Sequence, residues 1–231
     1  MEKLNMNKRM NWLMIGAGGI GGLFLDLTAR ALAFGGLASR VGGVSITVMD
    51  ADIVELRNLP HQRFAMGDAG RPKVDAVIEP LVAAGVCEQG ITFIPISENL
   101  TEETDLTGYD LVIVAVDRAE PRTWVHTGAK AWVDLRSSGD GFVLFSHETD
   151  SADIAFLPVQ SGAAGCQLPG AIESGNIQFG FSEAASHGAQ WAIQWLRSEK
   201  GEPTMLPRRR MMSIHMGELP FPQLEEMEAE E

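Results

Sequence analysis

A short apolar run passes directly into a glycine-rich turn near the N-terminus, in the stretch Trp12-Leu13-Met14-Ile15-Gly16-Ala17-Gly18-Gly19-Ile20-Gly21-Gly22. The apolar run predicts a buried parallel strand. Apolar residues at helical spacing over 23–34 predict a helix, which Gly35-Gly36 should end. A second strand is predicted over 44–50, and it ends in the carboxylate of Asp50. This order of strand, glycine turn, helix, strand and acid is that of a βαβ unit.

Strands and helices continue to alternate along the rest of the chain. We predict helices over 72–84, 120–131 and 181–195, and strands over 91–96, 110–117, 131–135, 141–145 and 211–216. Pro80 should bend or interrupt the first of these helices, and Pro95 favours an edge position for its strand. Residues 151–174 are expected to form a glycine-rich connection. The pattern predicts an α/β, Rossmann-like fold, with a mostly parallel sheet and helices on both faces.

Composition limits the classes of partner. The chain has 231 residues and a formal net charge of −13, so we expect neither nucleic acid nor an anionic membrane surface as its partner. Two cysteines are too few for a disulfide framework, and no apolar run approaches the ~20 residues of a membrane span. We therefore expect a cytoplasmic protein, with one domain over residues 1–222 and an acidic, disordered tail over 223–231.

The glycine turn has the spacing of a phosphate-binding loop. Gly16, Gly18, Gly19 and Gly21 allow close approach of the backbone to a ligand, and the helix that follows directs its free N–H groups at a phosphate. Asp50 is placed to accept hydrogen bonds from ribose hydroxyls. Up to this point an NAD(P)-dependent oxidoreductase would have the same pattern, so the turn predicts a nucleotide without deciding between ATP and NAD(P).

The next stretch is more specific. It contains Asp50-x-Asp52, then Asn58-Leu59-x-x-Gln62, and then Asp68-x-Gly70-x-x-Lys73. Val116-Asp117 follows at the end of a later predicted strand. The order and spacing of these groups resemble the ThiF/MoeB/ubiquitin-activating superfamily over about residues 11–145. The oxidoreductase alternative does not account for the groups between Asn58 and Lys73.

The resemblance implies roles for individual residues. Asp50 would bind ribose, Asn58 and Lys73 would contact phosphate, and Asp117 would help to hold Mg²⁺ beside the triphosphate of ATP. The same resemblance adds Asp52 and Gln62 to the nucleotide site. Taken singly, Lys73 is better explained as a solvated lysine at the start of a helix, and Asp117 as a residue that caps the next helix. Their occurrence together in this order favours the functional interpretation.

Two positions depart from the family pattern. The family's arginine falls at His61, and a neutral imidazole is a weaker phosphate partner than a guanidinium. Arg63 or Arg57 is a candidate substitute for it, and Arg9 is the one arginine in the short N-terminal arm. Cys166 lies where some relatives carry a nucleophilic cysteine, a role that requires a lowered thiol pKa. The alternative is a buried thiol without a chemical role.

These features lead to one principal hypothesis. The chain is expected to use ATP and Mg²⁺ to adenylate the C-terminal carboxylate of a small ubiquitin-like or sulfur-carrier protein, or of a peptide. The resemblance further implies a homodimer. A non-catalytic, nucleotide-binding scaffold of the same fold is the other alternative, because His61 replaces the family's arginine.

Overall fold

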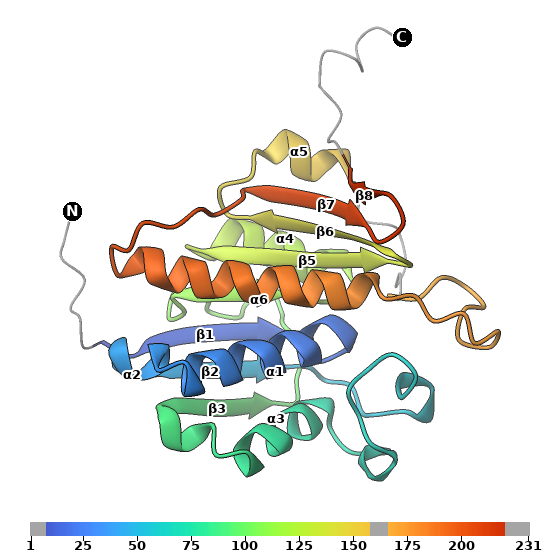
Figure 1. Ribbon diagram of the computed structural model, residues 1–231, viewed down its shortest axis with the longest axis horizontal. Coiled ribbons are helices and arrows are strands. Elements are labelled where there is room, and N and C mark those ends of the chain that lie inside the picture. Colours follow the sequence, from blue (N-terminus) through green and yellow to red (C-terminus); the bar gives the residue numbers. More distant parts are fainter. Residues whose placement is uncertain (1–7, 158–165, 220–231) are drawn as a thin grey trace, which may run out of the picture.

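The computed structural model describes residues 8–157 and 166–219. Its single sheet has eight strands in the order β3-β2-β1-β4-β5-β6-β7-β8 (Figure 1). The strands are β1 (Met10–Ile15), β2 (Val44–Met49), β3 (Ile91–Ile96), β4 (Leu111–Val114), β5 (Trp132–Ser138), β6 (Gly141–Ser146), β7 (Arg209–Ser213) and β8 (Gly217–Glu218). The helices are α1 (Gly19–Phe34), α2 (Leu37–Arg40), α3 (Lys73–Ala83), α4 (Ala119–Gly128), α5 (Ser151–Phe156) and α6 (Gly180–Glu199).

The sheet is parallel in one half and antiparallel in the other. β3, β2, β1, β4 and β5 run parallel to their neighbours. From β5 onward each new strand is antiparallel to the one before it. The predicted α/β, mostly parallel sheet is confirmed. The chain leaves β1 toward β2 and β3, and then returns to place β4 on the other side of β1, so the strand order reverses between β1 and β4.

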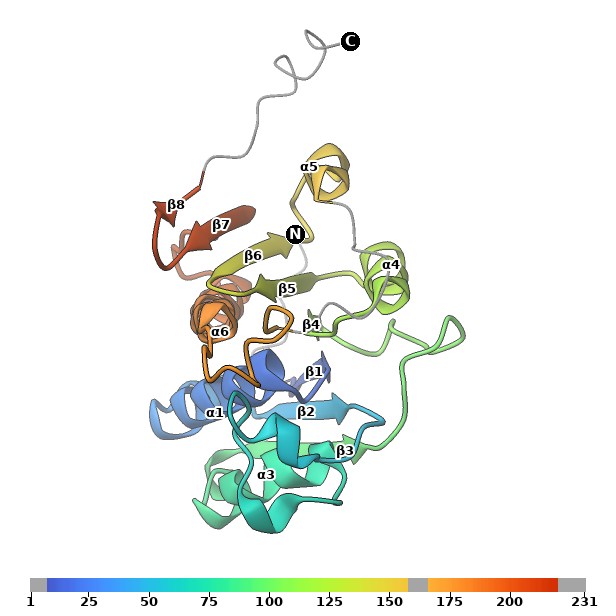
Figure 2. The ribbon, with the colours of Figure 1, turned by 90° about the vertical axis from the view of Figure 1, so that its right-hand side faces the viewer.

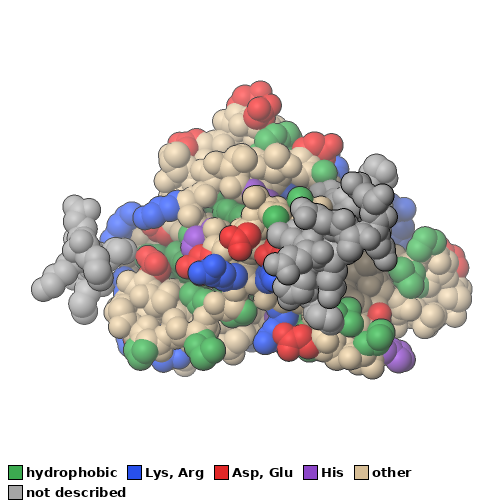
Figure 3. Space-filling model, turned by 90° about the horizontal axis from the view of Figure 1, so that it is seen from above, with side chains coloured by type: hydrophobic (Ala, Val, Ile, Leu, Met, Phe, Trp, Pro, Cys, Tyr) green, Lys and Arg blue, Asp and Glu red, His purple; other side chains and the backbone are tan. Residues whose placement is uncertain are grey.

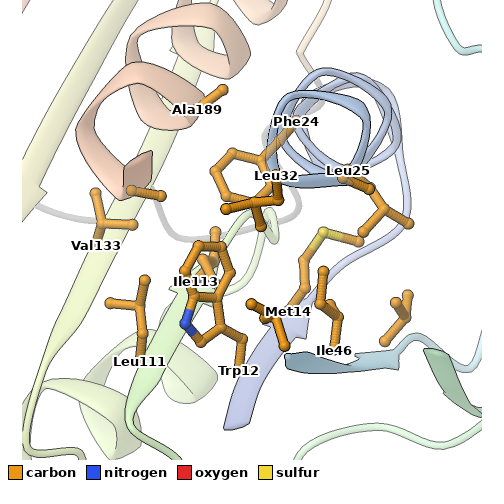
Figure 4. Packing of buried hydrophobic residues seen from close by; sticks show 14 of the residues in the cluster. Trp12, Met14, Phe24, Leu25, Leu32, Ile46, Leu111, Ile113, Val133 and Ala189 are labelled. Carbon is orange, nitrogen blue, oxygen red and sulfur yellow. The ribbon is translucent and has the colours of Figure 1, made fainter. Parts of the chain in front are cut away.

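Helices cover both faces of this sheet, as predicted. α1, α3 and α6 lie on one face, and α4 lies on the other (Figure 2). The core is densest where α1 and α6 meet the central strands, and Trp12, Phe24 and Ile113 are completely or almost completely buried there (Figure 4). Trp191 and Trp195 are buried along α6, and Trp195 packs edge-on against Trp12. Their helical spacing indicated core positions, which the structure confirms.

Several boundaries differ from the sequence prediction. Pro80 does not interrupt α3, which continues to Ala83; the ring lies on the exposed side of the helix, where the lost backbone donor costs least. Residues 151–156, predicted as part of a connection, form α5. The predicted late strand over 211–216 is a hairpin, with β7 beginning at Arg209 and turning into β8 at Gly217. The acidic tail over 223–231 lies outside the described residues.

The β7–β8 edge carries a basic run that is already paired. Arg208 lies 4.0 Å from Glu148, Arg210 lies 3.8 Å from Glu218, and Arg209 forms an ion pair with Asp153. Figure 3, which views the molecule from this edge, shows acidic and basic side chains interspersed. No helix among residues 8–157 and 166–219 has both the length and the apolar character needed to cross a membrane.

Candidate functional site

A pocket of about 650 Å³ opens at the carboxyl ends of β1, β2 and β4, where the strand order reverses. Ligands of open α/β sheets bind in this crevice. Part of its lining is apolar and includes Ile15, Met49, Leu100 and Ala115. The polar walls come from loops that follow the strands. They include Gly16, Gly18, Gly19, Asp50, Asp52, Asn58, His61, Gln62, Lys73 and Asp117, all of which the sequence placed at or beside a nucleotide site.

The glycine turn is fixed by close backbone approaches. Gly16 has a φ of +97°, and a Cβ added to it would lie 2.4 Å from the carbonyl oxygen of Ala115. A Cβ on Gly21 would lie 1.8 Å from the carbonyl oxygen of Gly16. No larger side chain fits at either position without movement of the backbone. Gly21, predicted as a cofactor-binding residue, is not among the pocket residues; it brings α1 against the turn.

Asp50 connects the turn to the segment after β2. Its Oδ2 accepts a hydrogen bond of 2.6 Å from the Ala17 backbone, and its Oδ1 accepts one of 2.8 Å from the Asp52 backbone. Burial raises the pKa of Asp50 above its ordinary value, although these two backbone donors work in the opposite direction. Each carboxylate oxygen retains a lone pair that can accept a bond from a ligand hydroxyl.

Lys73 enters the pocket from the first residue of α3. Its side chain is 9% exposed, and its Nζ lies 2.9 Å from Oδ2 of Asp52, whose own side chain is 68% exposed. The Lys73 backbone also donates to the Asp52 carbonyl over 2.9 Å. The lysine is thus held by the backbone and by a carboxylate that water reaches, so an incoming anion can compete for its ammonium group.

The segment between β2 and α3 supplies three further polar side chains. Asn58 is buried, and its Oδ1 accepts a 2.8 Å hydrogen bond from the Glu55 backbone. His61 and Gln62 follow, with their Nε2 atoms 3.2 Å apart. Burial lowers the pKa of His61, and the charge of Lys73 lowers it further. The imidazole is therefore neutral at pH 7.

Asp117 reaches the pocket from the end of β4. Its side chain is exposed, and no hydrogen bond or ion pair holds its carboxylate within the part of the chain that the structure describes. Beside it Arg118 donates a 3.0 Å hydrogen bond to Oδ1 of Asn99, and both residues border the pocket together with Glu98. None of these three was predicted as a site residue. Their signal was their position directly after the predicted strands 91–96 and 110–117.

Arg122 also borders the pocket, but its charge is already engaged. The guanidinium pairs with the fully buried carboxylate of Asp134 and donates to the Val116 carbonyl. Asp134 additionally accepts hydrogen bonds from Arg136 at 2.7 Å, and it lies 3.2 Å from Nε2 of His126. Burial alone would raise the pKa of Asp134, but these three neighbours hold it well below its ordinary value.

Cys166 lines the same pocket near Ser137 and Ile172. Burial raises the pKa of its thiol, and the nearby charge of Asp117 adds to that rise. This direction is opposite to the one that a nucleophilic thiolate requires. The position of the thiol is fixed by its neighbour Gln167, whose amide makes hydrogen bonds of 2.7 and 2.9 Å with the backbone of Gln178.

Two predicted or considered arginines lie elsewhere. Arg63 pairs with Asp26 on α1 over 3.3 Å and is not among the residues that line the pocket. Arg9 donates to Thr92 and covers Gly43, at the amino ends of the strands. Arg57 does border the pocket, where it pairs with Glu55 over 2.8 Å.

Several solved structures have the same fold. E. coli MccB with ATP aligns over 94% of this chain with 17% identity and a TM-score of 0.60. E. coli MccB with MccA aligns over 94% with 19% identity and a TM-score of 0.60. PaaA aligns over 93% with 16% identity and a TM-score of 0.61. This chain spans only 65% or 66% of the length of these proteins.

A search among curated proteins found no match. The ThiF family, in contrast, matches residues 1–229. That match covers both halves of the sheet and every wall of the pocket. The chain therefore belongs to the ThiF family.

Proposed function

We propose that this chain uses ATP to adenylate the C-terminal carboxylate of a peptide or a small carrier protein. The observation that carries the proposal is that Lys73 and Asp117 line the same pocket, together with the glycine turn and Asp50. MccB, a solved structure with the same fold, has been determined with ATP. It has also been determined with N-formylated MccA, and is described there as a microcin C7 biosynthetic enzyme.

The walls of the pocket suit the parts of ATP. The apolar part of the lining suits the base, and the free lone pairs of Asp50 suit the ribose hydroxyls. The start of α1 at Gly19 presents backbone N–H groups and the positive end of its dipole to the phosphates. His61 Nδ1 and Gln62 Oε1 are buried in the same pocket without a hydrogen-bond partner among the described residues, as expected where a polar ligand completes the site.

The reaction brings two anions together. An oxygen of the substrate carboxylate attacks the α-phosphorus, the bond from that phosphorus to the bridging oxygen breaks, and pyrophosphate leaves with the electron pair. Lys73 leaves Asp52 to contact the phosphates, so that its charge offsets the charge that builds on their oxygens. Asp117 would hold a magnesium ion, which would supply further neutralisation of the phosphate charge.

The polypeptide end must reach the same phosphate. We propose that it passes the wall that contains Ser137, Cys166 and Ile172, and that a tail of small residues such as Gly-Gly is accepted there. A ubiquitin-like or sulfur-carrier protein and a free peptide are alternative sources of this tail. A homodimer is the assembly that we propose from the family resemblance.

ATP–pyrophosphate exchange tests this function. Peptides with a free C-terminal carboxylate should support exchange, and the same peptides with an amidated end should not. Lys73→Ala should lower the exchange rate by about 10²–10³-fold, because it removes a charge that is used in the transition state. The matched control is Lys130→Ala, which removes an exposed lysine outside the pocket and should leave the rate unchanged.

The outcomes separate the alternatives. Exchange that survives Lys73→Ala would overturn the assignment of the site. Thermal stabilisation by NAD(P) in place of ATP would favour an oxidoreductase, and binding of ATP without exchange for any tail would favour a scaffold.

A further inference from the structure

Two polar atoms in the pocket have no partner among the described residues. His61 Nδ1 and Gln62 Oε1 are both buried, and both belong to residues that line the cavity. A buried polar atom that is left unpaired destabilises the site, because it has lost its hydrogen bond to water. Gln62 Oε1 is the atom nearest to the position that a Cβ on Gly18 would take, at 3.7 Å, so it lies against the glycine turn.

The contact between the two side chains fixes the tautomer of His61. An amide nitrogen can only donate, so Gln62 Nε2 donates to His61 Nε2 across the 3.2 Å between them. The single ring proton of the neutral imidazole is therefore on Nδ1, and Nδ1–H is the donor that lacks an acceptor. A phosphate oxygen at this position would supply that acceptor.

The charges that face His61 explain why it is neutral in the absence of nucleotide. α3 contributes the ammonium group of Lys73, which is paired with Asp52. The first turn of α1 contributes glycines and no acid, and α6 contributes the edge of Phe181, with ring centroids 6.4 Å apart. In the preceding loop Glu55 is paired with Arg57. The local field thus disfavours a cation until an anion enters.

We propose that His61 binds the polyphosphate of the nucleotide as an imidazolium, taking up one proton from solvent when the nucleotide enters. This inference rests on the proposed function, because it requires ATP in the pocket. In the charged ring both nitrogens donate: Nδ1–H to a phosphate oxygen, and Nε2–H to Gln62. For this the side-chain amide of Gln62 reverses its orientation, so that Oε1 accepts the hydrogen bond from His61. Its Nε2–H groups then point toward the glycine turn.

This rearrangement pairs both atoms that are unpaired in the free protein. No covalent bond forms or breaks, and the only species gained from solvent is the proton. Burial and Lys73 lower the pKa of His61 in the free protein, whereas several phosphate charges beside the ring would raise it in the complex. Affinity for the polyphosphate is therefore greatest below the free-protein pKa, and it falls as the pH rises through the pKa of the complex. We expect an affinity change of about tenfold across this window.

Isothermal titration calorimetry tests the proton uptake. MgATP is titrated into the full chain at pH 7 in buffers with different enthalpies of protonation, which gives the number of protons bound per nucleotide. Wild type should bind several tenths of a proton more than His61→Gln, and the difference should vanish near pH 9. The comparison between the two proteins cancels the protonation of ATP itself. Adenosine, which has no phosphate, should give no difference.

His187→Gln is the matched control. His187 is half-buried and also has a pKa lowered by burial, but it stacks on Phe142 and contacts Arg210 away from the pocket. Its replacement should leave the proton uptake at the wild-type value. His61→Arg carries a permanent charge, so it should bind ATP with an affinity that no longer depends on the protonation of residue 61.

A spectroscopic measurement does not depend on the variants' stability. The imidazole resonances of His61 should titrate at higher pH with MgATP than without it. ATP binding with equal proton uptake in wild type and His61→Gln, or with an unchanged titration of His61, would overturn this inference and leave the proposed function intact. Absence of ATP binding to wild type would overturn both.

Discussion

Two cation–carboxylate pairs border the same pocket and differ in almost every physical respect. Lys73 is held by Asp52, a mostly exposed carboxylate that has no second cationic partner among the described residues. Arg122 is held by Asp134, which is fully buried and shared with Arg136 and His126. Water screens the first pair, and it does not reach the carboxylate of the second.

The difference indicates which cation is available to a substrate. A phosphate group can replace the exposed Asp52 at small cost, because that carboxylate is then solvated by water. Removing Arg122 from Asp134 would leave a buried charge with fewer partners, which is far more costly. A cation that lines a pocket is therefore not necessarily a ligand-binding group. Whether it can bind a ligand depends on whether the carboxylate it is already paired with is exposed or buried.

The largest difference between the two pairs is expected in the free energy of unfolding when the carboxylate of each pair is removed. Asp134→Ala should lower the free energy of unfolding by about 3–5 kcal/mol, because it leaves buried cations without their shared partner. Asp52→Ala should cost clearly less, because it leaves one ammonium group unpaired and water can take the place of the exposed carboxylate beside it. Urea unfolding followed by circular dichroism measures both values. Equal losses in the two variants would mean that burial does not separate the pairs.

Asp117 sharpens the comparison, because it is an exposed carboxylate five residues before the engaged Arg122. Asp117→Ala should reduce the rate of ATP–pyrophosphate exchange by about 10²–10³-fold, which is the usual effect in enzymes of removing one group that stabilises transition-state charge. Its unfolding free energy should change little, since no hydrogen bond or ion pair among the described residues depends on it. Glu120→Ala, on the first turn of α4 and outside the pocket, is the control. Retained exchange in Asp117→Ala would remove Asp117 from the site.

The smallest effect is expected at Cys166. Burial raises the pKa of its thiol, so the group is protonated at neutral pH and is not poised as a nucleophile. Cys166→Ala should leave the rate of exchange within about twofold of wild type, because adenylation needs no thiol. A transfer step after adenylation, if one exists, is the only place where this variant should differ. Loss of exchange itself would show that the thiol takes part in the first step.

The sequence predicted the nucleotide half of the molecule well, for a physical reason. The features that identify this half can each be recognised from neighbouring residues in the sequence. They are the glycines of the turn at Gly16, the strand that ends at Asp50, and the helix that begins at Lys73. The pocket then follows, because parallel strands bring their carboxyl ends to one edge. The same reasoning placed Trp191 and Trp195 in the core through their helical spacing.

The misses depend on contacts between distant residues. Arg63 was a candidate for the site, but it pairs with Asp26 on α1. The residues near Arg63 in the sequence do not indicate that pair. The pairing of Arg122 with Asp134 was equally hidden, since it joins α4 to β5. α5 was missed because its six residues are too few to show a periodic apolar face.

One amide at the base of the 166–178 segment has a consequence for substrate range. The side-chain amide of Gln167 donates to the backbone carbonyl of Gln178 and accepts from its backbone N–H, so these two hydrogen bonds hold the ends of the segment together. The exposed stretch between them contains Gly170 and Gly175, both with positive φ. Such a closed loop tolerates changes of length and composition at its tip while its base stays in register. Under the proposed function, divergence confined to that tip would alter which polypeptide ends are accepted without moving Cys166 or the glycine turn.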